Sequence, residues 1–178
     1  MNRKQFLKSL GGFGALAFAA SAGVSAGTIP GFRAKRTVRE YTGELSAPPE
    51  AVFPLLCPVR EYEWLDGWTC EMIYSESGVA EENCIFKTPH GPATWNVDRY
   101  EPPRRIAFTV VSPNQVCRLH ITLEPTATGG TKLTWRRTFT GLNDAGNADI
   151  DFWSTDRDRE LMRQIEYFTK TGKMAHAT

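Results

Sequence analysis

The sequence is poor in the residues that usually build metal and cofactor centres. It has three histidines and four cysteines in 178 residues, and none of them combine in a C-x-x-C pair or at the spacing of a zinc finger. A serine nucleophile elbow, a phosphate-binding loop and a dinucleotide-binding glycine pattern are also missing from the chain. We therefore expect neither a metal ion nor a cofactor, and no motif identifies a catalytic residue.

An excess of charge of one sign is missing as well. Lysine and arginine total 21 against 20 acidic residues, a formal net charge of +1, so no basic field favours nucleic acid as a partner. Hydrophobic residues make up 41% of the chain and charged residues 23%. This composition is typical of a globular domain and excludes wholesale disorder.

The first 26 residues have the pattern of a signal peptide. Arg3, Lys4 and Lys8 precede an apolar stretch rich in glycine and alanine, and small residues end the segment at Ala26. The stretch is too short for a comfortable membrane span. Its basic part resembles the twin-arginine export signal, with Lys4 at the place of the second arginine; a Sec signal or an uncleaved anchor is the alternative. We expect export to the periplasm or the extracellular space, with no stable membrane span after removal of residues 1–26.

The four cysteines lie in apolar or strand-like surroundings. They are Cys57, Cys70, Cys84 and Cys117. Free cysteine is a common small core residue, whereas an exported protein can oxidise its thiols. The sequence favours buried thiols and leaves open whether any two of them form a disulfide.

The rest of the chain predicts one domain over residues 37–172, after a linker at 27–36 and before a tail at 173–178. A first strand is expected at 37–46. Pro48 and Pro49 then favour the start of a short helix, because proline fits the first helical turn. Pro58 separates that helix from a second short one.

From Trp68 the apolar residues alternate with a period of two. Turn residues divide this part into six strands, expected at 69–75, 84–88, 93–101, 105–112, 116–124 and 132–140. Because short turns join them, neighbouring strands must be antiparallel. After Gly141, apolar positions from Ile150 to Phe168 recur at steps of three and four, which predicts one long helix. An α+β fold follows, with a curved seven-stranded antiparallel sheet gripping a long C-terminal helix.

This order of elements resembles the SRPBCC superfamily, the START or birch-pollen-allergen-like helix-grip proteins. The resemblance is carried by Ala47-Pro48-Pro49-Glu50-Ala51-Val52-Phe53, by Tyr100-Glu101-Pro102-Pro103-Arg104-Arg105-Ile106-Ala107-Phe108, and by the hairpin Gly129-Gly130-Thr131-Lys132-Leu133-Thr134-Trp135. The segment from Cys57 to Trp68 is similar to a subgroup described as polyketide-cyclase-like. The resemblance implies a deep cavity between the sheet and the long helix. Members of the superfamily bind lipids, sterols, polyketides or other apolar molecules, and some are cyclases, aromatases or hydrolases.

Arg137 is the first candidate for chemistry. It alternates with Leu133, Trp135 and Phe139 on one face of the last strand, so its guanidinium is expected inside the apolar face. A buried guanidinium requires a partner. It could anchor a ligand carboxylate or enolate, pair with an internal acid such as Glu61 or Glu71, or reach solvent at the end of the strand.

Aromatic residues and one acid complete the candidate site. Trp64 and Trp68 lie in the short-helix segment that forms the cavity rim in this fold, and Trp95 and Trp135 are expected on the inner face of the sheet. They form an aromatic wall if a ligand binds and a packed core if none does. Glu61 could act as a general base near an apolar cavity, or could be a solvated surface acid beside Glu63. Trp153 is expected in the core.

Three functions fit these observations. The preferred one is binding or carriage of an apolar small molecule of lipid, polyketide or aromatic type. A cyclase or dehydratase acting on a polyketide-like or aromatic substrate is the second, with Glu61 and Arg137 as its first candidates. The third is a protein-interaction module whose cavity is filled by its own side chains. The sequence identifies neither the ligand nor the oligomeric state.

Overall fold

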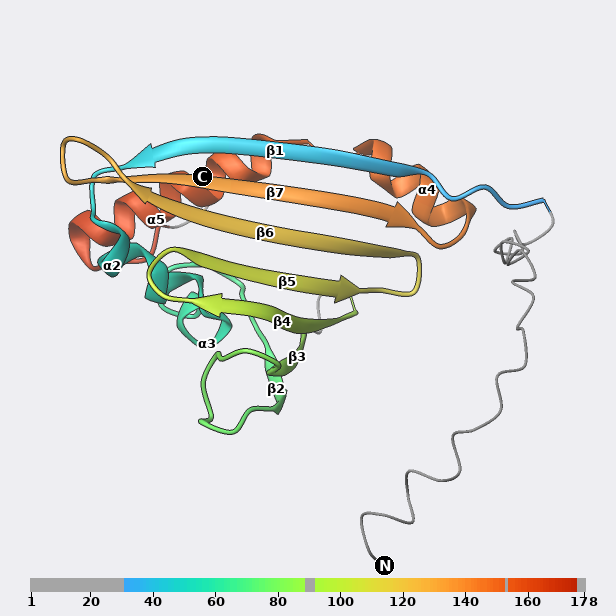
Figure 1. Ribbon diagram of the computed structural model, residues 1–178, viewed down its shortest axis with the longest axis horizontal. Coiled ribbons are helices and arrows are strands. Elements are labelled where there is room, and N and C mark those ends of the chain that lie inside the picture. The colour runs from blue at the N-terminus through green and yellow to red at the C-terminus, as the bar shows by residue number, and fades with distance from the viewer. Residues whose placement is uncertain (1–30, 89–91, 153, 176–178) are drawn as a thin grey trace, which may run out of the picture. The chain divides into compact units, whose positions relative to one another are not determined.

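One antiparallel sheet of seven strands forms the frame of the computed structural model, which describes residues 31–88, 92–152 and 154–175 (Figure 1). The strands lie in the order β1-β7-β6-β5-β4-β3-β2. They are β1 (Arg36–Leu45), β2 (Glu71–Tyr74), β3 (Ile85–Thr88), β4 (Ala93–Glu101), β5 (Arg105–Val111), β6 (Gln115–Pro125) and β7 (Thr131–Gly141). The predicted signal peptide at 1–26 and Trp153 lie outside the described residues.

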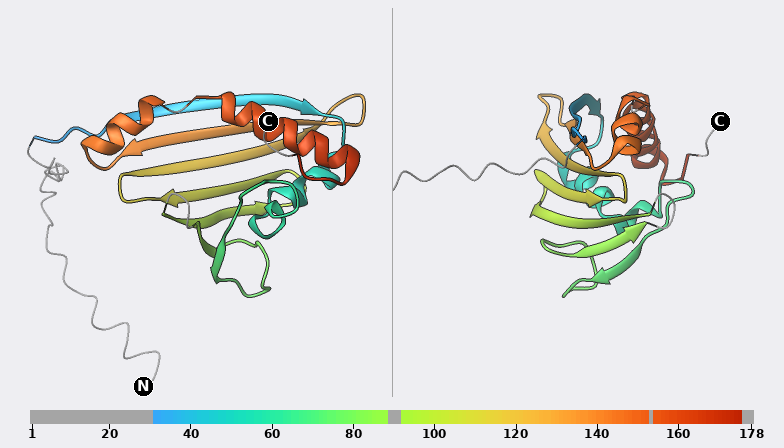
Figure 2. Two further views of the ribbon diagram at one scale, coloured as in Figure 1. Left: turned by 180° about the vertical axis from the view of Figure 1, so that it is seen from behind. Right: turned by 90° about the vertical axis from the view of Figure 1, so that its right-hand side faces the viewer.

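Helices flank the sheet in two groups. The first group follows β1 and consists of α2 (Pro49–Val52), the 3-10 helix η1 (Phe53–Leu56) and α3 (Pro58–Glu61); the second consists of α4 (Asp144–Phe152) and α5 (Asp156–Thr171). The sheet curves around the side on which both groups lie (Figure 2). The predicted α+β helix-grip architecture is therefore confirmed.

Alternation along β7 sets one face of the core. Leu133, Trp135, Arg137 and Phe139 are buried, whereas Lys132 and Arg136 between them are exposed. This is the period of two expected of a strand with one buried face. The β6–β7 turn that precedes it has Gly129 at φ +83°, a conformation that glycine adopts without steric cost.

The predicted long C-terminal helix is two helices. At the start of α5 the Ser154 hydroxyl accepts a hydrogen bond from the backbone N–H of Asp156 and donates to its carboxylate, both at 3.2 Å. Such local bonds offer the backbone an alternative to helix continuation, and α5 begins there with its own first turn. Both helices contribute to the predicted apolar stripe, because Ile150 of α4 and Met162 and Ile165 of α5 are buried. Helix α5 ends at Gly172 in the left-handed conformation, as expected of a C-terminal cap.

The start of α4 is fastened to the β5–β6 turn. The Asn143 amide donates to the Asn114 side-chain oxygen at 3.1 Å, and the Leu142 N–H donates to the Asn114 carbonyl at 2.8 Å. Gly146 on the first turn of α4 lies against the same Asn114 carbonyl, in the space where a Cβ would stand. The helix therefore meets the turn backbone to backbone.

All four cysteines are free. Cys57 and Cys84 are buried, and Cys70 and Cys117 are half-buried. Burial raises the pKa of each thiol, and that of Cys117 to about 12. The four groups are therefore neutral thiols near pH 7.

Candidate functional site

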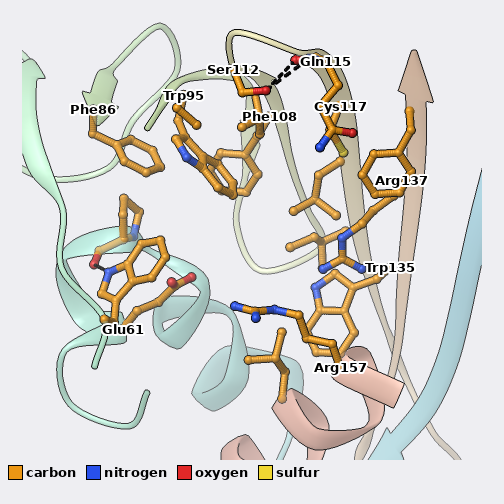
Figure 3. Close-up of a pocket in the computed structure, with 18 of the residues that line it drawn as sticks. Glu61, Phe86, Trp95, Phe108, Ser112, Gln115, Cys117, Trp135, Arg137 and Arg157 are labelled. Atoms are coloured by element: carbon orange, nitrogen blue, oxygen red, sulfur yellow. Dashed lines mark hydrogen bonds between the residues drawn. The ribbon is translucent and has the colours of Figure 1, made fainter. Parts of the chain in front are cut away.

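A cavity of about 560 Å³ opens between the concave face of the sheet and the helices (Figure 3). Its volume lies within the range of small-molecule sites. Apolar side chains dominate the lining. The lining includes all of the predicted residues, Glu61, Trp64, Trp68, Trp95, Trp135 and Arg137.

An aromatic cluster forms one wall of the cavity. Trp95 on β4 stacks on Phe86 of β3 with ring centroids 5.4 Å apart and an interplanar angle of 20°. It also meets Phe108 of β5 edge to face at 5.7 Å, and Trp68 at 6.4 Å. Phe86 and Trp95 are directly opposed cross-strand partners, so the sheet register itself brings these rings together.

The two tryptophans of the short-helix segment differ in exposure. Trp64 is 2% exposed, and its indole N–H donates to the Leu55 carbonyl at 2.8 Å. Trp68 is half-buried, and its indole donates to the Pro58 carbonyl at 2.9 Å. Both hydrogen bonds tie the segment to itself and occupy the indole donors, so these rings offer the cavity apolar surface.

Arg137 forms a buried ion pair with Asp158 of α5. The expectation of Glu61 or Glu71 as its partner is wrong: Glu71 lies exposed on β2, and Asp158 is 1% exposed beneath the helix. Burial raises the pKa of Asp158 and lowers the pKa of Arg137, while the attraction between the two opposes both shifts. The Arg137 guanidinium also lies 6.0 Å from the centre of the Trp135 ring. The pair joins α5 to the sheet across the cavity wall.

Glu61 is a half-buried acid in the cavity lining. It is the last residue of α3, and its carboxyl points into the space toward the guanidinium of Arg157 (Figure 3). Desolvation raises the pKa of Glu61 to about 8, and the positive charge of Arg157 opposes that rise. Its neighbour Glu63 is exposed and pairs with Arg60 through two hydrogen bonds of 2.7 Å. The two acids therefore have separate roles, and only Glu61 faces the cavity.

Sequence reasoning missed three polar residues of the site. These are Arg157 and Asp158 on α5 and Gln115 on β6. Gln115 starts β6, and among the described residues its buried Oε1 has no hydrogen-bond partner. The signal available for Arg157 was its place on the apolar stripe, where a cation has to face either a partner or a ligand.

The part of the chain that the structure describes has neither a metal-binding cluster nor a membrane-spanning helix. Three or more histidine, cysteine, aspartate or glutamate side chains nowhere gather at metal-binding distance within residues 31–88, 92–152 and 154–175. Over the same ranges no helix is both long and apolar enough to cross a membrane.

Comparison with protein families gives one clear match. A family model described as "Polyketide cyclase / dehydrase and lipid transport" matches residues 36–163, which includes every strand and the first half of α5. A comparison with curated proteins gave no match.

Solved structures share the fold at low sequence identity. DynU16, a protein from the dynemicin biosynthetic locus, is 19% identical with a TM-score of 0.56; the alignment covers 76% of this chain and 48% of DynU16, so this chain spans about half of that protein. Ara h 8.0201 is 14% identical with a TM-score of 0.59, covering 77% and 99%. Norcoclaurine synthase from Thalictrum flavum, in complex with dopamine and hydroxybenzaldehyde, is 11% identical with a TM-score of 0.58, covering 79% and 90%. At these identities the likeness shows the fold alone.

Proposed function

This chain belongs to the polyketide cyclase/dehydrase and lipid transport family, and from that premise we propose that it binds or carries an apolar small molecule in the cavity between sheet and helices. The resemblance to the SRPBCC helix-grip superfamily is confirmed by the same match and by the structural neighbours. The observation that supports this proposal most directly is the cavity of about 560 Å³, with its aromatic wall of Phe86, Trp95 and Phe108. A cavity filled by its own side chains, as an interaction module requires, does not fit that volume.

Titration with the neutral apolar dye N-phenyl-1-naphthylamine tests this proposal. We expect saturable binding with dye fluorescence enhanced on transfer from water to the cavity. Trp95→Leu removes the central ring of the wall and should weaken binding about tenfold, since a lost aromatic contact of about 1.4 kcal/mol corresponds to that factor. Tyr74→Leu, at an exposed position on β2, is the control and should bind like the wild type. Equal binding by both variants, or none by the wild type, would contradict the proposal.

A second candidate function is cyclase-type catalysis, and one observation favours it. Glu61 holds a proton near neutral pH inside an apolar cavity, and its pKa of about 8 is close to the value that general acid–base catalysis needs. Assay of a polyketide-like β-keto substrate should then show turnover that Glu61→Gln abolishes while dye binding is retained. Turnover that persists in this variant would exclude Glu61 as the catalytic group.

Residues 1–26 add a proposal about location. Their basic start, apolar stretch and small-residue end support export of the folded chain. Mass spectrometry of the protein recovered outside the cytoplasm should give a mass reduced by these 26 residues. Recovery of the full-length mass from the cytoplasmic fraction would contradict the export route.

A further inference from the structure

The guanidinium of Arg157 faces the cavity without a partner of its own. Within the described residues it makes no ion pair or hydrogen bond, although it lies in a helix where the other arginines are paired. Arg159 pairs with Asp156 at 2.8 Å, and Arg163 pairs with Glu160 at 2.6 Å. Arg157 is exposed to solvent at the edge of the cavity, so its guanidinium is free to form a charge-assisted pair with an anionic ligand group.

The groups around Arg157 do not cancel its charge. Asp158 is committed to Arg137. Glu61 faces Arg157 but is mostly protonated at pH 7, because its pKa is about 8. Asp149 of α4 also lines the cavity, and it is exposed to solvent. The helix side of the cavity therefore offers one unneutralised guanidinium and one carboxyl group that can donate a hydrogen bond.

The sheet side of the cavity offers a different surface. Phe86, Trp95 and Phe108 present rings to the space, and Figure 3 shows them across the cavity from Arg157. A ligand that satisfies both sides has a planar ring system at one end and an anion at the other.

We propose that the cavity selects an aromatic carboxylate. Its ring lies against the aromatic wall of Phe86, Trp95 and Phe108, and its carboxylate is bound by Arg157 and by a hydrogen bond from Glu61. This inference rests on the proposed binding function and specifies the chemical class of the guest. A ligand carboxylate can form a charge-assisted, bidentate ion pair with the Arg157 guanidinium. An arylalkylamine, which is protonated at pH 7, carries the wrong charge for this site, and a neutral arene leaves the guanidinium unpaired.

Three naphthalene derivatives of matched size test the selection. Binding of 2-naphthoic acid, 2-naphthamide and 2-naphthylmethylamine is measured by calorimetry at pH 7 with the full chain. We expect the acid to bind at least tenfold more tightly than the amide, and the amine most weakly. Arg157→Gln should remove the preference for the acid over the amide, and Arg157→Lys should keep part of it. Arg163→Gln, on the same helix but paired with Glu160, should keep all of it.

The outcomes separate this inference from the broader binding proposal. Equal binding of acid and amide by the wild type, or a preference that survives Arg157→Gln, overturns the selection, while binding of N-phenyl-1-naphthylamine still supports the cavity as a binding site. Failure of every compound and of the dye overturns both. Tightest binding of the amine would assign the site to a cation and overturn the carboxylate.

A pH series adds a readout that a purely structural role of Arg157 would not move. When Glu61 loses its proton, it neutralises Arg157 and repels the ligand carboxylate, so affinity for the acid should fall between pH 7 and pH 9 while affinity for the amide stays level. Glu61→Gln should bind the acid without this decline. Cys57 and Cys70 interact electrostatically with Glu61, and Cys117, Arg137, Asp149 and Arg157 line the same cavity. Arg60 acts on Cys57, and Asp158 pairs with Arg137. A decline that persists in Glu61→Gln would assign the pH response to one of these and overturn the role of Glu61.

Discussion

Arg137 of β7 and Arg157 of α5 line the same cavity, and they differ in what holds them. Arg137 is 7% exposed and its charge is matched by Asp158, which is itself 1% exposed. Arg157 is solvent-exposed and makes no ion pair within the described residues, and the Glu61 carboxyl that faces it is mostly protonated at pH 7. A buried cation with a built-in partner serves the fold, whereas an accessible cation without one is available to a ligand. The strand arginine is therefore a stabilising residue, and the helix arginine is the recognition residue.

The largest test of this comparison is to break the buried pair. Asp158→Asn leaves the Arg137 guanidinium buried without its counter-charge, and we expect the free energy of unfolding to fall by about 3–5 kcal/mol. Urea denaturation followed by tryptophan fluorescence measures the change. The double replacement Arg137→Met with Asp158→Leu removes both charges and should recover most of the loss, because apolar residues of similar volume often replace buried ion pairs without penalty. A double variant as unstable as the single one would mean that the pair has a further role.

The next largest effect concerns Glu61 and depends on pH. The pKa of Glu61 rises from its ordinary value of 4.5 to about 8 in the folded protein. Between pH 4.5 and pH 8 the folded state therefore holds a proton that the unfolded chain has released. Stability contributed by the protonated form is present below pH 4.5 and is lost as the pH rises toward 8. At about 1.4 kcal/mol per pKa unit, and allowing for the half-buried position, Glu61→Gln should gain about 2–4 kcal/mol over the wild type at pH 8.

The control for that gain is the same pair of proteins at acid pH. At pH 4 both side chains are neutral, and the stabilities measured by denaturation should agree within about 0.5 kcal/mol. A difference of constant size from pH 4 to pH 8 would contradict the raised pKa of Glu61.

The smallest effect sharpens the contrast between the two arginines. Arg157→Gln removes an accessible cation that makes no ion pair or hydrogen bond within the described residues, so the free energy of unfolding at pH 7 should change by less than about 0.5 kcal/mol. The same denaturation curve on Arg137→Gln should show a loss of several kcal/mol, because Asp158 is then buried alone. Equal losses at the two positions would remove the distinction between them.

Much of the fold could be predicted from the sequence because its signals are local. A period of two and the intervening turns located all seven strands within about two residues, and the burial of Arg137 followed from strand parity alone. The break between α4 and α5 was not predicted, since it depends on hydrogen bonds of the Ser154 hydroxyl that an apolar stripe does not reveal.

The polar half of the site was less accessible to sequence reasoning. Asp158 reaches Arg137 only because α5 crosses the inner face of β7, and a charged residue on a helix is solvated far more often than buried. The protonated state of Glu61 depends on desolvation by neighbours distant in sequence. The aromatic wall was partly predicted, through Trp68, Trp95 and Trp135, while Phe86 and Phe108 were not selected because many phenylalanines simply pack in a core.

Gly146 allows α4 to pack directly against the β5–β6 turn, which forms one end of the cavity. The turn against which it lies supplies Ser112, Pro113, Asn114 and Gln115 to the lining, and the contact there leaves no room for even one added carbon atom. A methyl group at position 146 would have to lift α4 or push the turn inward, so the size of guest accepted at that end can change through a residue that no guest touches.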